Sequence, residues 1–360
     1  MNTVPGVWGV PRITVAVHAG QLLQPVPGGI GRYVGHLLDA LPGAGVEPLP
    51  FAAGAAPAGI APWIDLGWPR GPLRYELWHR TRRPRVRVAG DVVHATSLAV
   101  PPAGRRPLVV TVHDVVFLRQ PDLLTPRGVA FHTRGLELAR REAAAVIVPT
   151  EFGKADLVAE GFDAARIHVA PHGVDAPSRS DVPAPAPWPY VLSVATIEPR
   201  KGVDDLLEAH ARLRHRHPDL SLVLAGPTGW GAPPDTDRPG VVVAGALDDD
   251  ALDAAYRGAV ALALPSRYEG FGLQVVEAMA RGCPVVTSDA ACLPEVGGGA
   301  TIIVPVGDIT ALTDALHGLL TDGRARSELA AAGIARAAGF TWAHSAAMHR
   351  AAYLDAMDRS

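Results

Sequence analysis

The sequence predicts an α/β protein of two doubly wound, Rossmann-like domains, each a parallel sheet with helices on both faces. Short β-branched runs alternate with Ala- and Leu-rich helical stretches along most of the chain, which is the pattern of βαβ units. The chain has 360 residues, room for two domains at about 150 residues each. Residues 177–189 hold five prolines, a composition typical of a stiff linker because proline interrupts helices and sheet interiors.

The expected elements follow this pattern in chain order. In the first domain, residues 1–176, strands are expected at 13–18, 46–51, 91–95, 108–113, 145–149 and 167–171. In the second domain, residues 190–340, strands are expected at 190–195, 220–225, 241–244, 260–265, 284–288 and 302–304. From about Gly323 the chain is expected to be helical, with Gly333 and Gly339 as breaks, and Thr341 caps a last helix over 341–360.

Composition excludes several classes of protein. Lys and Arg number 33 against 36 Asp and Glu, a balance that gives no support to a nucleic-acid binder. Hydrophobic residues make up 48%, so the chain is not globally disordered. Cys283 and Cys292 are too few for a disulfide framework or a four-cysteine zinc site. With no recognisable signal peptide and no apolar run of the ~20 residues that span a bilayer, we expect a soluble, cytoplasmic protein.

The strongest local feature is a strand–turn–helix junction in the second domain. An apolar strand ends at Pro265, the turn SRYEGF occupies residues 266–271, and a helix is expected to begin near Gly272. Such a junction presents backbone N–H groups and the positive end of a helix dipole, which suits a phosphate or a sugar hydroxyl. Glu269 lies in the turn and Glu277 about two turns into the helix, so the two carboxylates could bind different hydroxyl groups of a polyhydroxylated ligand. Taken singly, Glu269 is better explained by a favourable helix start and Glu277 by a solvated helix face.

A basic pair follows the first strand after the linker. Arg200 and Lys201 stand in the segment VATIEPRKG, residues 194–202. Arginine offers a forked hydrogen-bonding group and lysine a point charge, so the pair can clamp a diphosphate. A helix start with two solvated cations is the alternative interpretation.

A glycine-rich segment in the first domain is a weaker signal. Gly28, Gly29 and Gly31 would let the backbone of a loop approach a ligand closely. The segment is not a dinucleotide-binding fingerprint, because Val34 stands where that motif needs glycine.

Histidines fall at several expected strand ends. His113 and Asp114 close the strand over 108–113, and His18, His94 and His172 occupy similar places. A histidine at a strand end is more often structural than catalytic. No metal-ligand spacing supports a zinc site here, and we expect no bound metal.

Two charged segments have simpler explanations. Asp248, Asp249 and Asp250 resemble an acidic metal-binding triplet, but they directly precede a helix expected over 251–258, where they would cap its N-terminus. Residues 70–87 hold seven arginines and a single acidic residue, Glu76. An anionic membrane surface or a phosphorylated acceptor suits these arginines, and a solvated helix is the alternative interpretation.

Together these segments resemble glycosyltransferase family 4, a large family of retaining enzymes with the GT-B fold. Glu269 and Glu277 match the family's E-x7-E element, Arg200 and Lys201 its basic diphosphate-binding pair, Gly28–Gly31 its glycine-rich loop, and His113 its strand-end histidine. Further similarity covers PTEF at 149–152, PHGVD at 171–175, LPEV at 293–296 and FTW at 340–342, the start of a helix that crosses back to the first domain. Ala195 departs from the family, which often has glycine there.

The resemblance implies a reaction without a metal or another cofactor. A nucleoside diphosphate sugar would bind mainly to the second domain and an acceptor to the first, across a cleft between them. Glu277 would hold the ribose and Glu269 the sugar hydroxyls, while Arg200 and Lys201 would neutralise the departing diphosphate. His113 would orient the sugar and stabilise the developing cation during front-face attack. The remaining donor-binding residues would be Gly28, Gly29, Asp114, Ser266, Phe271, Gly272 and Leu273.

The same resemblance suggests a donor. The segment IEPRK at 197–201, together with His113 and Asp114, is most similar to the mannosyltransferase branch, which points to GDP-mannose and a glycan or lipid-linked acceptor. A hexosyltransferase that uses a UDP-sugar is the first alternative, and a non-catalytic scaffold that binds nucleotide sugars is the second.

Overall fold

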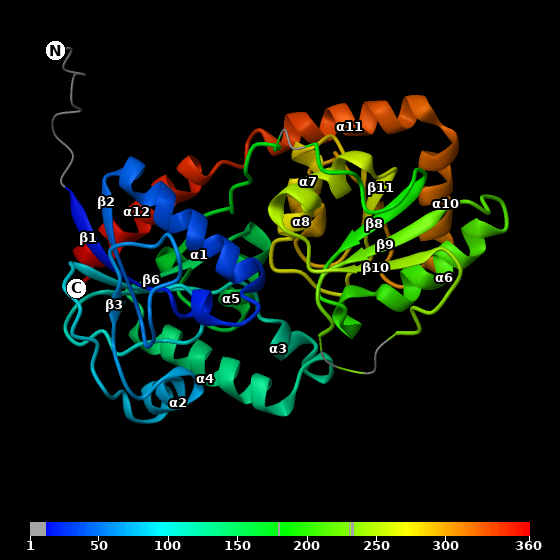
Figure 1. Ribbon diagram of the computed structural model, residues 1–360. Helices are drawn as coiled ribbons and strands as arrows, with labels where there is room; N and C mark the ends of the chain where they lie inside the picture. The colour runs from blue at the N-terminus through cyan, green and yellow to red at the C-terminus, as the bar shows by residue number, and fades with distance from the viewer. Residues whose placement is uncertain (1–11, 179–180, 230, 232–233) are drawn as a thin grey trace, which may run out of the picture. The chain divides into compact units, whose positions relative to one another are not determined.

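The computed structural model describes residues 12–178, 181–229, 231 and 234–360. By their internal contacts these residues form two compact units (Figure 1). Unit 1 contains the described chain up to Pro149, Gly153–Pro171 and Trp342–Ser360, and unit 2 contains Thr150–Phe152 and the described part of His172–Thr341. The domain boundaries expected from the sequence stay predictions. Residues 1–11, part of the stretch in which no signal peptide is recognisable, lie outside the described residues.

Unit 1 is built on a seven-stranded parallel sheet. Its strands are β1 Ile13–His18, β2 Val46–Ala52, β3 Ile64–Asp65, β4 Val92–Ala95, β5 Leu108–Thr111, β6 Ala145–Val148 and β7 Ile167–Val169. They lie in the order β3-β2-β1-β4-β5-β6-β7, and every pairing is parallel. The order reverses between β1 and β4, so the crossovers cover both faces of the sheet.

Alternating residues of β1 show the two buried faces of unit 1. Val15 and Val17 join one core with helices α1 and α12, whereas Ala16 joins the other core with α2 and α4. The helices of this unit are α1 Gly28–Ala40, α2 Gly71–Thr81, α3 Val116–Arg119, α4 Pro126–Glu142 and α12 Trp342–Asp358; α5 Glu151–Ala159 begins in unit 2 and continues in unit 1. The last helix of the chain therefore completes the core of unit 1.

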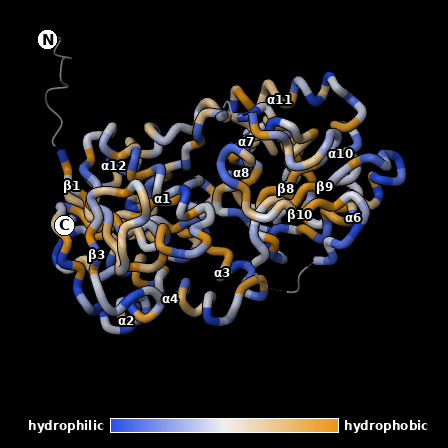
Figure 2. Tube along the Cα trace, viewed as in Figure 1, coloured by the Kyte–Doolittle hydropathy of each residue, from blue (hydrophilic) through white to orange (hydrophobic). Residues whose placement is uncertain are grey.

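Unit 2 has a second parallel sheet of the same type. Its strands are β8 Tyr190–Val194, β9 Ser221–Ala225, β10 Val241–Gly245, β11 Ala261–Leu264, β12 Val285–Ser288 and β13 Ile302–Val304, in the order β10-β9-β8-β11-β12-β13. The helices are α6 Val203–Arg214, α7 Asp249–Gly258, α8 Leu273–Ala280, α9 Leu293–Gly297, α10 Ile309–Thr321 and α11 Gly323–Ala337. Helices α6 and α10 cover one face, while α7, α8 and α9 cover the other. The strands β8 and β9 are among the most hydrophobic segments of the trace (Figure 2).

Each expected strand is present, with its ends within two residues of the expected ones, and the doubly wound fold is confirmed. The short strand β3 was not expected. Gly333 does not break a helix, since it lies inside α11 against Met279 of α8, where its missing side chain lets the two helices approach closely. Residues 70–87 are helical only over α2. Among the residues that the structure describes, none of the helices has both the length and the apolar character to cross a membrane.

Candidate functional site

The candidate site of unit 2 lies where its strand order reverses. Ligands of open parallel sheets bind beyond the carboxyl ends of the strands at this point. Here the reversal lies between β8 and β11. The basic pair belongs to the short 3-10 turn Pro199–Lys201 that follows β8, and the glutamate-bearing turn follows β11. The fold therefore brings the two strongest sequence signals to one edge of the sheet.

A glycine allows the two loops to touch. Gly202, with a φ of 65°, follows the basic pair, and a Cβ atom on it would lie 2.2 Å from the carbonyl oxygen of Pro265. The backbone N–H of Arg267 donates a hydrogen bond to the carbonyl of Arg200 at 2.8 Å. A side chain at position 202 would separate the loops, so the glycine is required for their packing.

Lys201 and Glu269 form a buried ion pair between these loops. The Nζ atom of Lys201 lies 2.6 Å from Oε1 of Glu269, and the two side chains are 9% and 7% exposed. The hydroxyl of Ser266 donates to the same carboxylate oxygen at 2.7 Å. Burial by itself would raise the pKa of Glu269, but the positive charges of Lys201 and Arg200 outweigh it and hold that pKa below its ordinary value. Glu269 is therefore an ionised carboxylate and does not simply favour the helix start.

Arg200 is held in place by a second carboxylate. Its Nη2 and Nε atoms lie 2.8 and 3.0 Å from Oε1 of Glu198, and its Nη1 donates to the carbonyl of Tyr268 at 3.0 Å. Burial raises the pKa of Glu198, although Arg200 and Lys201 oppose the shift. The interpretation of the basic pair as solvated cations is wrong, because both side chains are largely buried. Sequence reasoning missed Glu198 as a site residue, although it stands two positions before Arg200.

Glu277 lies on α8 and has a partner on α7. The hydroxyl of Tyr256 donates to Oε2 of Glu277 at 2.9 Å, and Glu277 is 9% exposed. The interpretation of Glu277 as a solvated face residue is therefore wrong. Tyr256 was not predicted, and no sequence pattern singles it out, because its contact joins two helices separated by the strand β11.

The start of α8 has the geometry of an anion or hydroxyl site. Gly272 caps the helix in the left-handed region with a φ of 84°, and Leu273 is its first residue. The N–H groups at such a helix start have no partner within the helix and carry the positive end of its dipole. Phe271 is buried, with the ring of His172 at 4.8 Å. Ser266 thus contacts Glu269 of the ion pair, and Phe271, Gly272 and Leu273 follow Glu269 at the start of α8. Their part in donor binding stays a prediction.

The expected site residues of the first domain lie in unit 1. His113 follows β5, and its Nε2–H donates to the carbonyl of Thr96 at 2.9 Å. Burial lowers the pKa of His113, an effect that this hydrogen bond and Asp114 oppose. Asp114 accepts a hydrogen bond from the backbone N–H of Val116, the first residue of α3, at 3.1 Å. The neutral imidazole is the form of His113 at pH 7.

The glycine-rich segment differs from its expected form. Gly28 and Gly29 do not belong to a loop, because they form the first turn of α1, in which Gly28 has a φ of 62°. Gly31 faces Pro27 so closely that a Cβ atom on it would lie 2.2 Å from the proline Cβ. The glycines therefore allow the helix to start tightly against Pro27.

The acidic triplet acts as a helix cap. Asp248 accepts a hydrogen bond from the backbone N–H of Ala251 at 2.8 Å, and Asp250 accepts one from the hydroxyl of Ser178 at 2.7 Å. Within the described part of the chain, no group of three or more His, Cys, Asp or Glu side chains has a geometry that could hold a metal ion.

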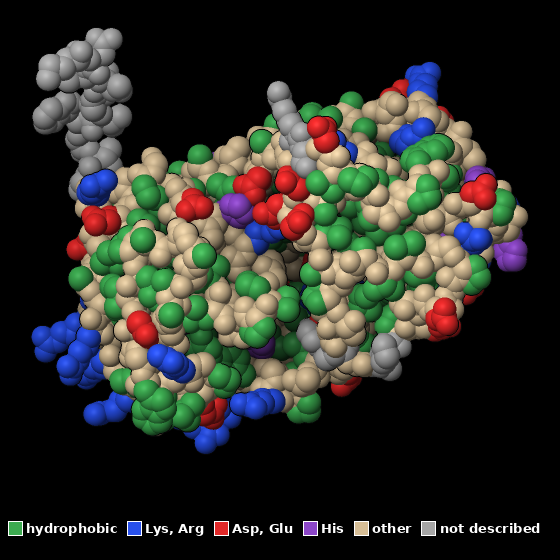
Figure 3. All heavy atoms as spheres, in the orientation of Figure 1, with side chains coloured by type: hydrophobic (Ala, Val, Ile, Leu, Met, Phe, Trp, Pro, Cys, Tyr) green, Lys and Arg blue, Asp and Glu red, His purple; other side chains and the backbone are tan. Residues whose placement is uncertain are grey.

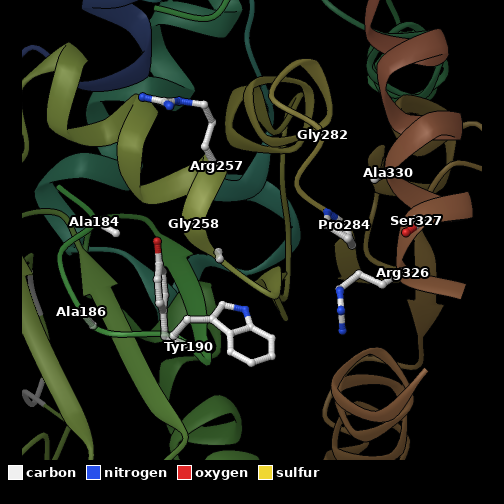
Figure 4. Close-up of a pocket in the computed structure, with 12 residues that line it drawn as sticks. Ala184, Ala186, Tyr190, Arg257, Gly258, Gly282, Pro284, Arg326, Ser327 and Ala330 are labelled. Carbon is white, nitrogen blue, oxygen red and sulfur yellow. The ribbon is translucent and has the colours of Figure 1, made fainter. Parts of the chain in front are cut away.

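A cavity of about 490 Å³ lies elsewhere in unit 2 (Figure 4). Tyr190 at the start of β8 and Pro284 just before β12 are among its lining residues, with Trp188 and Arg326. It therefore opens at the amino ends of the strands and is not part of the site at their carboxyl ends.

Two family profiles match the chain. The profile described as Glycosyltransferase Family 4 matches residues 27–177, and the profile described as Glycosyl transferases group 1 matches residues 188–322. The two matches cover the segments that carry the glycine-rich turn, His113, the basic pair and both glutamates.

Curated relatives and solved structures agree with the profiles. The chain is 28% identical to O-antigen chain mannosyltransferase B of Escherichia coli over 65% of this chain and 66% of that protein. It is 32% identical to the MMP alpha-(1->4)-mannosyltransferase of Mycolicibacterium hassiacum over 70% of this chain and 66% of the relative, so it spans about two thirds of either relative. Sucrose-phosphate synthase from Thermosynechococcus elongatus has a similar fold, with a TM-score of 0.75 at 21% identity over 97% of this chain and 100% of the other. HepE of Anabaena, solved with UDP-glucose, gives a TM-score of 0.70 at 19% identity over 95% and 99%.

Proposed function

Because this chain belongs to glycosyltransferase family 4 and has the GT-B fold, we propose that it transfers a sugar from a nucleoside diphosphate donor to an acceptor. The observation that carries the proposal is the cluster of Arg200, Lys201 and Glu269 beside the start of α8. Positive charge, a hydroxyl acceptor and helix N–H donors are what a sugar diphosphate requires. Solved relatives of the same fold were determined with UDP and with UDP-glucose, which supports a nucleotide-sugar donor.

The proposed roles follow from the contacts of each group. The ammonium of Lys201 has three N–H donors and Glu269 takes one, so the others are available to a diphosphate oxygen. Glu198 fixes one edge of the Arg200 guanidinium, which orients its remaining N–H groups. Glu269 would hold the sugar hydroxyls with the amides of Phe271, Gly272 and Leu273. Glu277, oriented by Tyr256, would hold the ribose.

Leaving-group stabilisation would come from side chains. Charge grows on the diphosphate as the glycosidic bond breaks, and pre-oriented cations stabilise it without reorganisation. We propose that Arg200 and Lys201 supply this charge without a metal ion, and that the acceptor attacks the same face that the diphosphate leaves, which retains the anomeric configuration. In unit 1, the residues that we propose to bind the donor are His113, Asp114, Gly28 and Gly29. NMR of the product anomer during the first turnovers tests retention.

Mannose from GDP-mannose is the donor we propose. Several of the matched relatives are named as mannosyltransferases, and the segment IEPRK at 197–201 is similar to that branch. UDP-sugars remain the alternative, since HepE was solved with UDP-glucose. The acceptor that we propose is a glycan or a lipid-linked intermediate.

A thermal-shift panel with GDP, UDP, ADP and NAD tests these assignments. A ligand at 100 times its dissociation constant adds about 2.7 kcal/mol, which raises the unfolding midpoint by roughly 5–10 °C for domains of this size. We expect this shift with GDP. With an acceptor present, we expect transfer of mannose from GDP-mannose to the acceptor and release of GDP. A shift with UDP alone would change the donor, whereas a shift with GDP and no transfer to any glycan would favour a non-catalytic scaffold.

We also propose that unit 1 binds an anionic membrane surface around α2. Trp68, three residues before this helix, and Leu73, in its first turn, are 81% and 50% exposed. Arg83, Arg85 and Arg87 follow the helix and are exposed. Figure 3 shows Lys and Arg side chains gathered over this part of unit 1. An exposed aromatic ring close to several arginines suits the interface of an anionic bilayer.

Vesicle sedimentation tests the membrane proposal. We expect binding to vesicles of phosphatidylserine mixed with phosphatidylcholine, and none to vesicles of pure phosphatidylcholine. The variant Trp68→Ala with Arg83→Ala and Arg85→Ala should lose binding. Equal binding of the variant and the wild type would contradict the proposal. The variant Trp188→Ala with Arg216→Ala and Arg238→Ala, which removes the same kinds of residue from unit 2, is the control.

A further inference from the structure

A continuous line of buried polar side chains joins α12 to the sheet of unit 1. The hydroxyl of Tyr353 lies 2.9 Å from Nδ1 of His94, whose Nε2 lies 2.8 Å from the hydroxyl of Thr111. Thr111 lies 3.0 Å from the hydroxyl of Tyr33, which lies 2.8 Å from Nε2 of His349. All five side chains are at most 1% exposed. Each contact therefore has to satisfy its donors and acceptors without water.

Only one direction of donation satisfies every contact. His349 places Nδ1 2.7 Å from the carbonyl of Ser345, so Nδ1 carries the proton and Nε2 accepts from Tyr33. Burial lowers the pKa of His349 to about 4 and that of His94 well below its ordinary value, so both rings are neutral. Thr111 must then donate to the Tyr33 oxygen, because otherwise two lone pairs would face each other at 3.0 Å.

The remaining donors follow from this order. Once Thr111 donates to Tyr33, the Nε2–H of His94 donates to Thr111, and Tyr353 donates to Nδ1 of His94. The sequence of donation is Tyr353, His94, Thr111, Tyr33, His349 and the carbonyl of Ser345. The hydroxyl of Tyr33 thus has a fixed donor and a fixed acceptor, and the acceptor belongs to the last helix of the chain.

The ring of Tyr33 also contacts the histidine of the candidate site. Thr111 is the last residue of β5, and His113 follows it by two positions. Tyr33 covers both: its hydroxyl contacts Thr111, and its ring meets that of His113 edge to face, with centroids 5.0 Å apart at 81°. Thr96 accepts a hydrogen bond from His113 as a further contact. Tyr33 is therefore one of the groups that confine the His113 ring.

We propose that Tyr33 is a positioning residue, whose hydroxyl is anchored by His349 and Thr111 so that its ring sets the orientation of His113. The inference rests on the proposed role of His113 in sugar transfer. It gives α12 a function beyond stability, because a residue of this last helix fixes the tyrosine that contacts the site.

A double-mutant cycle tests the proposal. Tyr33→Phe keeps the ring and removes the anchored hydroxyl; we expect kcat to fall about tenfold, since small misplacements of catalytic groups cost that much or more, with an unchanged KM for the donor. In the His113→Ala background, Tyr33→Phe should cost less than twofold, because the residue through which it acts is gone. Equal losses in both backgrounds would overturn the proposal.

Tyr353→Phe is the matched control. It also removes one buried hydroxyl of the same network, but it leaves the contacts of Tyr33 with Thr111 and His349 intact. We expect it to lower the unfolding midpoint as much as Tyr33→Phe does, with an unchanged kcat. If the unfolding midpoint falls in both variants and kcat falls in neither, the network is structural only and the proposal fails.

A measurement without turnover separates this proposal from the proposed function. The imidazole signals of His113, assigned by comparison with His113→Ala, report its tautomer and the ring current of Tyr33. We expect Tyr33→Phe to shift these signals and Tyr353→Phe to leave them in place. Unshifted signals in Tyr33→Phe would overturn the positioning role even if the protein proved to be no glycosyltransferase, whereas shifted signals without sugar transfer would reject only the proposed function.

Discussion

The Nζ atom of Lys201 lies 2.6 Å from Oε1 of Glu269, and both side chains are almost fully buried. The pair joins the loops after β8 and β11, which are distant in sequence. Two opposite charges withdrawn from water contribute little net stability, because desolvation offsets their attraction. Their position at the carboxyl edge of the sheet points to a role in binding and chemistry.

Lys201→Ala should lose most of the transfer activity while the protein stays folded. Removal of one pre-oriented charge from a transition state costs about 10²–10³-fold in kcat. The unfolding midpoint should fall as well, because Glu269 is left buried with weaker partners. Steady-state kinetics and circular dichroism check both expectations. Lys154→Ala, which removes the chain's other lysine, is the control; undiminished turnover in Lys201→Ala would remove the diphosphate-clamp assignment.

Tyr256→Phe should weaken nucleotide binding through Glu277. A hydrogen bond to a charged group contributes about 1.5–3 kcal/mol, so we expect Kd for the nucleoside diphosphate to rise about tenfold or more. Tyr190→Phe is a matched control in the same unit, since it also removes a hydroxyl bound to α7, but that hydroxyl donates to the carbonyl of Ala255 and not to Glu277. Titration calorimetry measures both. The ribose assignment of Glu277 is wrong if the two variants bind equally well.

Transfer should continue in excess EDTA. Arg200 and Lys201 supply the positive charge beside the proposed leaving group. Asp248 caps helix α7, and Asp250 accepts a hydrogen bond from the hydroxyl of Ser178. The rate with and without EDTA, followed by addition of Mg²⁺ or Mn²⁺, is the measurement. A rate that disappears with the chelator and returns with the metal would contradict the proposal of metal independence.

His18 should make the protein less stable as the pH falls. Its ring packs among Phe51, Tyr75 and Trp78, neither of its ring nitrogens has a hydrogen-bond partner among the described residues, and burial, with the nearby charge of Arg74, lowers its pKa to about 3. In the unfolded chain the pKa is near 6.5, so between these values the unfolded state holds the extra proton. The free energy of unfolding therefore decreases as the pH falls below 6.5.

His18→Leu isolates this effect. Its free energy of unfolding, relative to wild type, should rise by up to about 1.4 kcal/mol for each pH unit below 6.5. Urea denaturation at pH 7.5, 6.0 and 5.0 measures the difference. His215→Leu, which removes an exposed histidine, should keep the wild-type dependence. Parallel curves for His18→Leu and wild type would show that His18 is not a buried neutral histidine.

Local patterns in the sequence predicted much of this protein. The strands are apolar runs that alternate with helical stretches, so their positions depend on residues within each run, and all expected strands are present. Arg200, Lys201 and Glu269 were recognised because they stand in turns that follow strands, and Glu277 because it lies in the helix after the same turn as Glu269. The acidic cap at Asp248 is local for the same reason.

The partners of these residues had no such signal. Glu198 holds Arg200 and Tyr256 holds Glu277, but each contact depends on how a loop or a helix packs. Burial also reversed two interpretations, those of solvated cations at the basic pair and of a solvated Glu277. Exposure is a property of the packed unit, and a single segment does not carry it.

By itself the sequence determined that the chain forms two parallel-sheet domains, and that the basic pair and the two glutamates stand in segments that follow strands. Strand periodicity and turn residues act over a few positions, so they can be recognised in the sequence. Only the tertiary structure decided that Lys201 pairs with Glu269 and that Tyr33 bonds His349, which is 316 residues away. These contacts depend on the order of the strands and on the return of α12 to the first sheet. That order is set by the burial of whole faces of sheet and helix, to which each residue contributes only a small part.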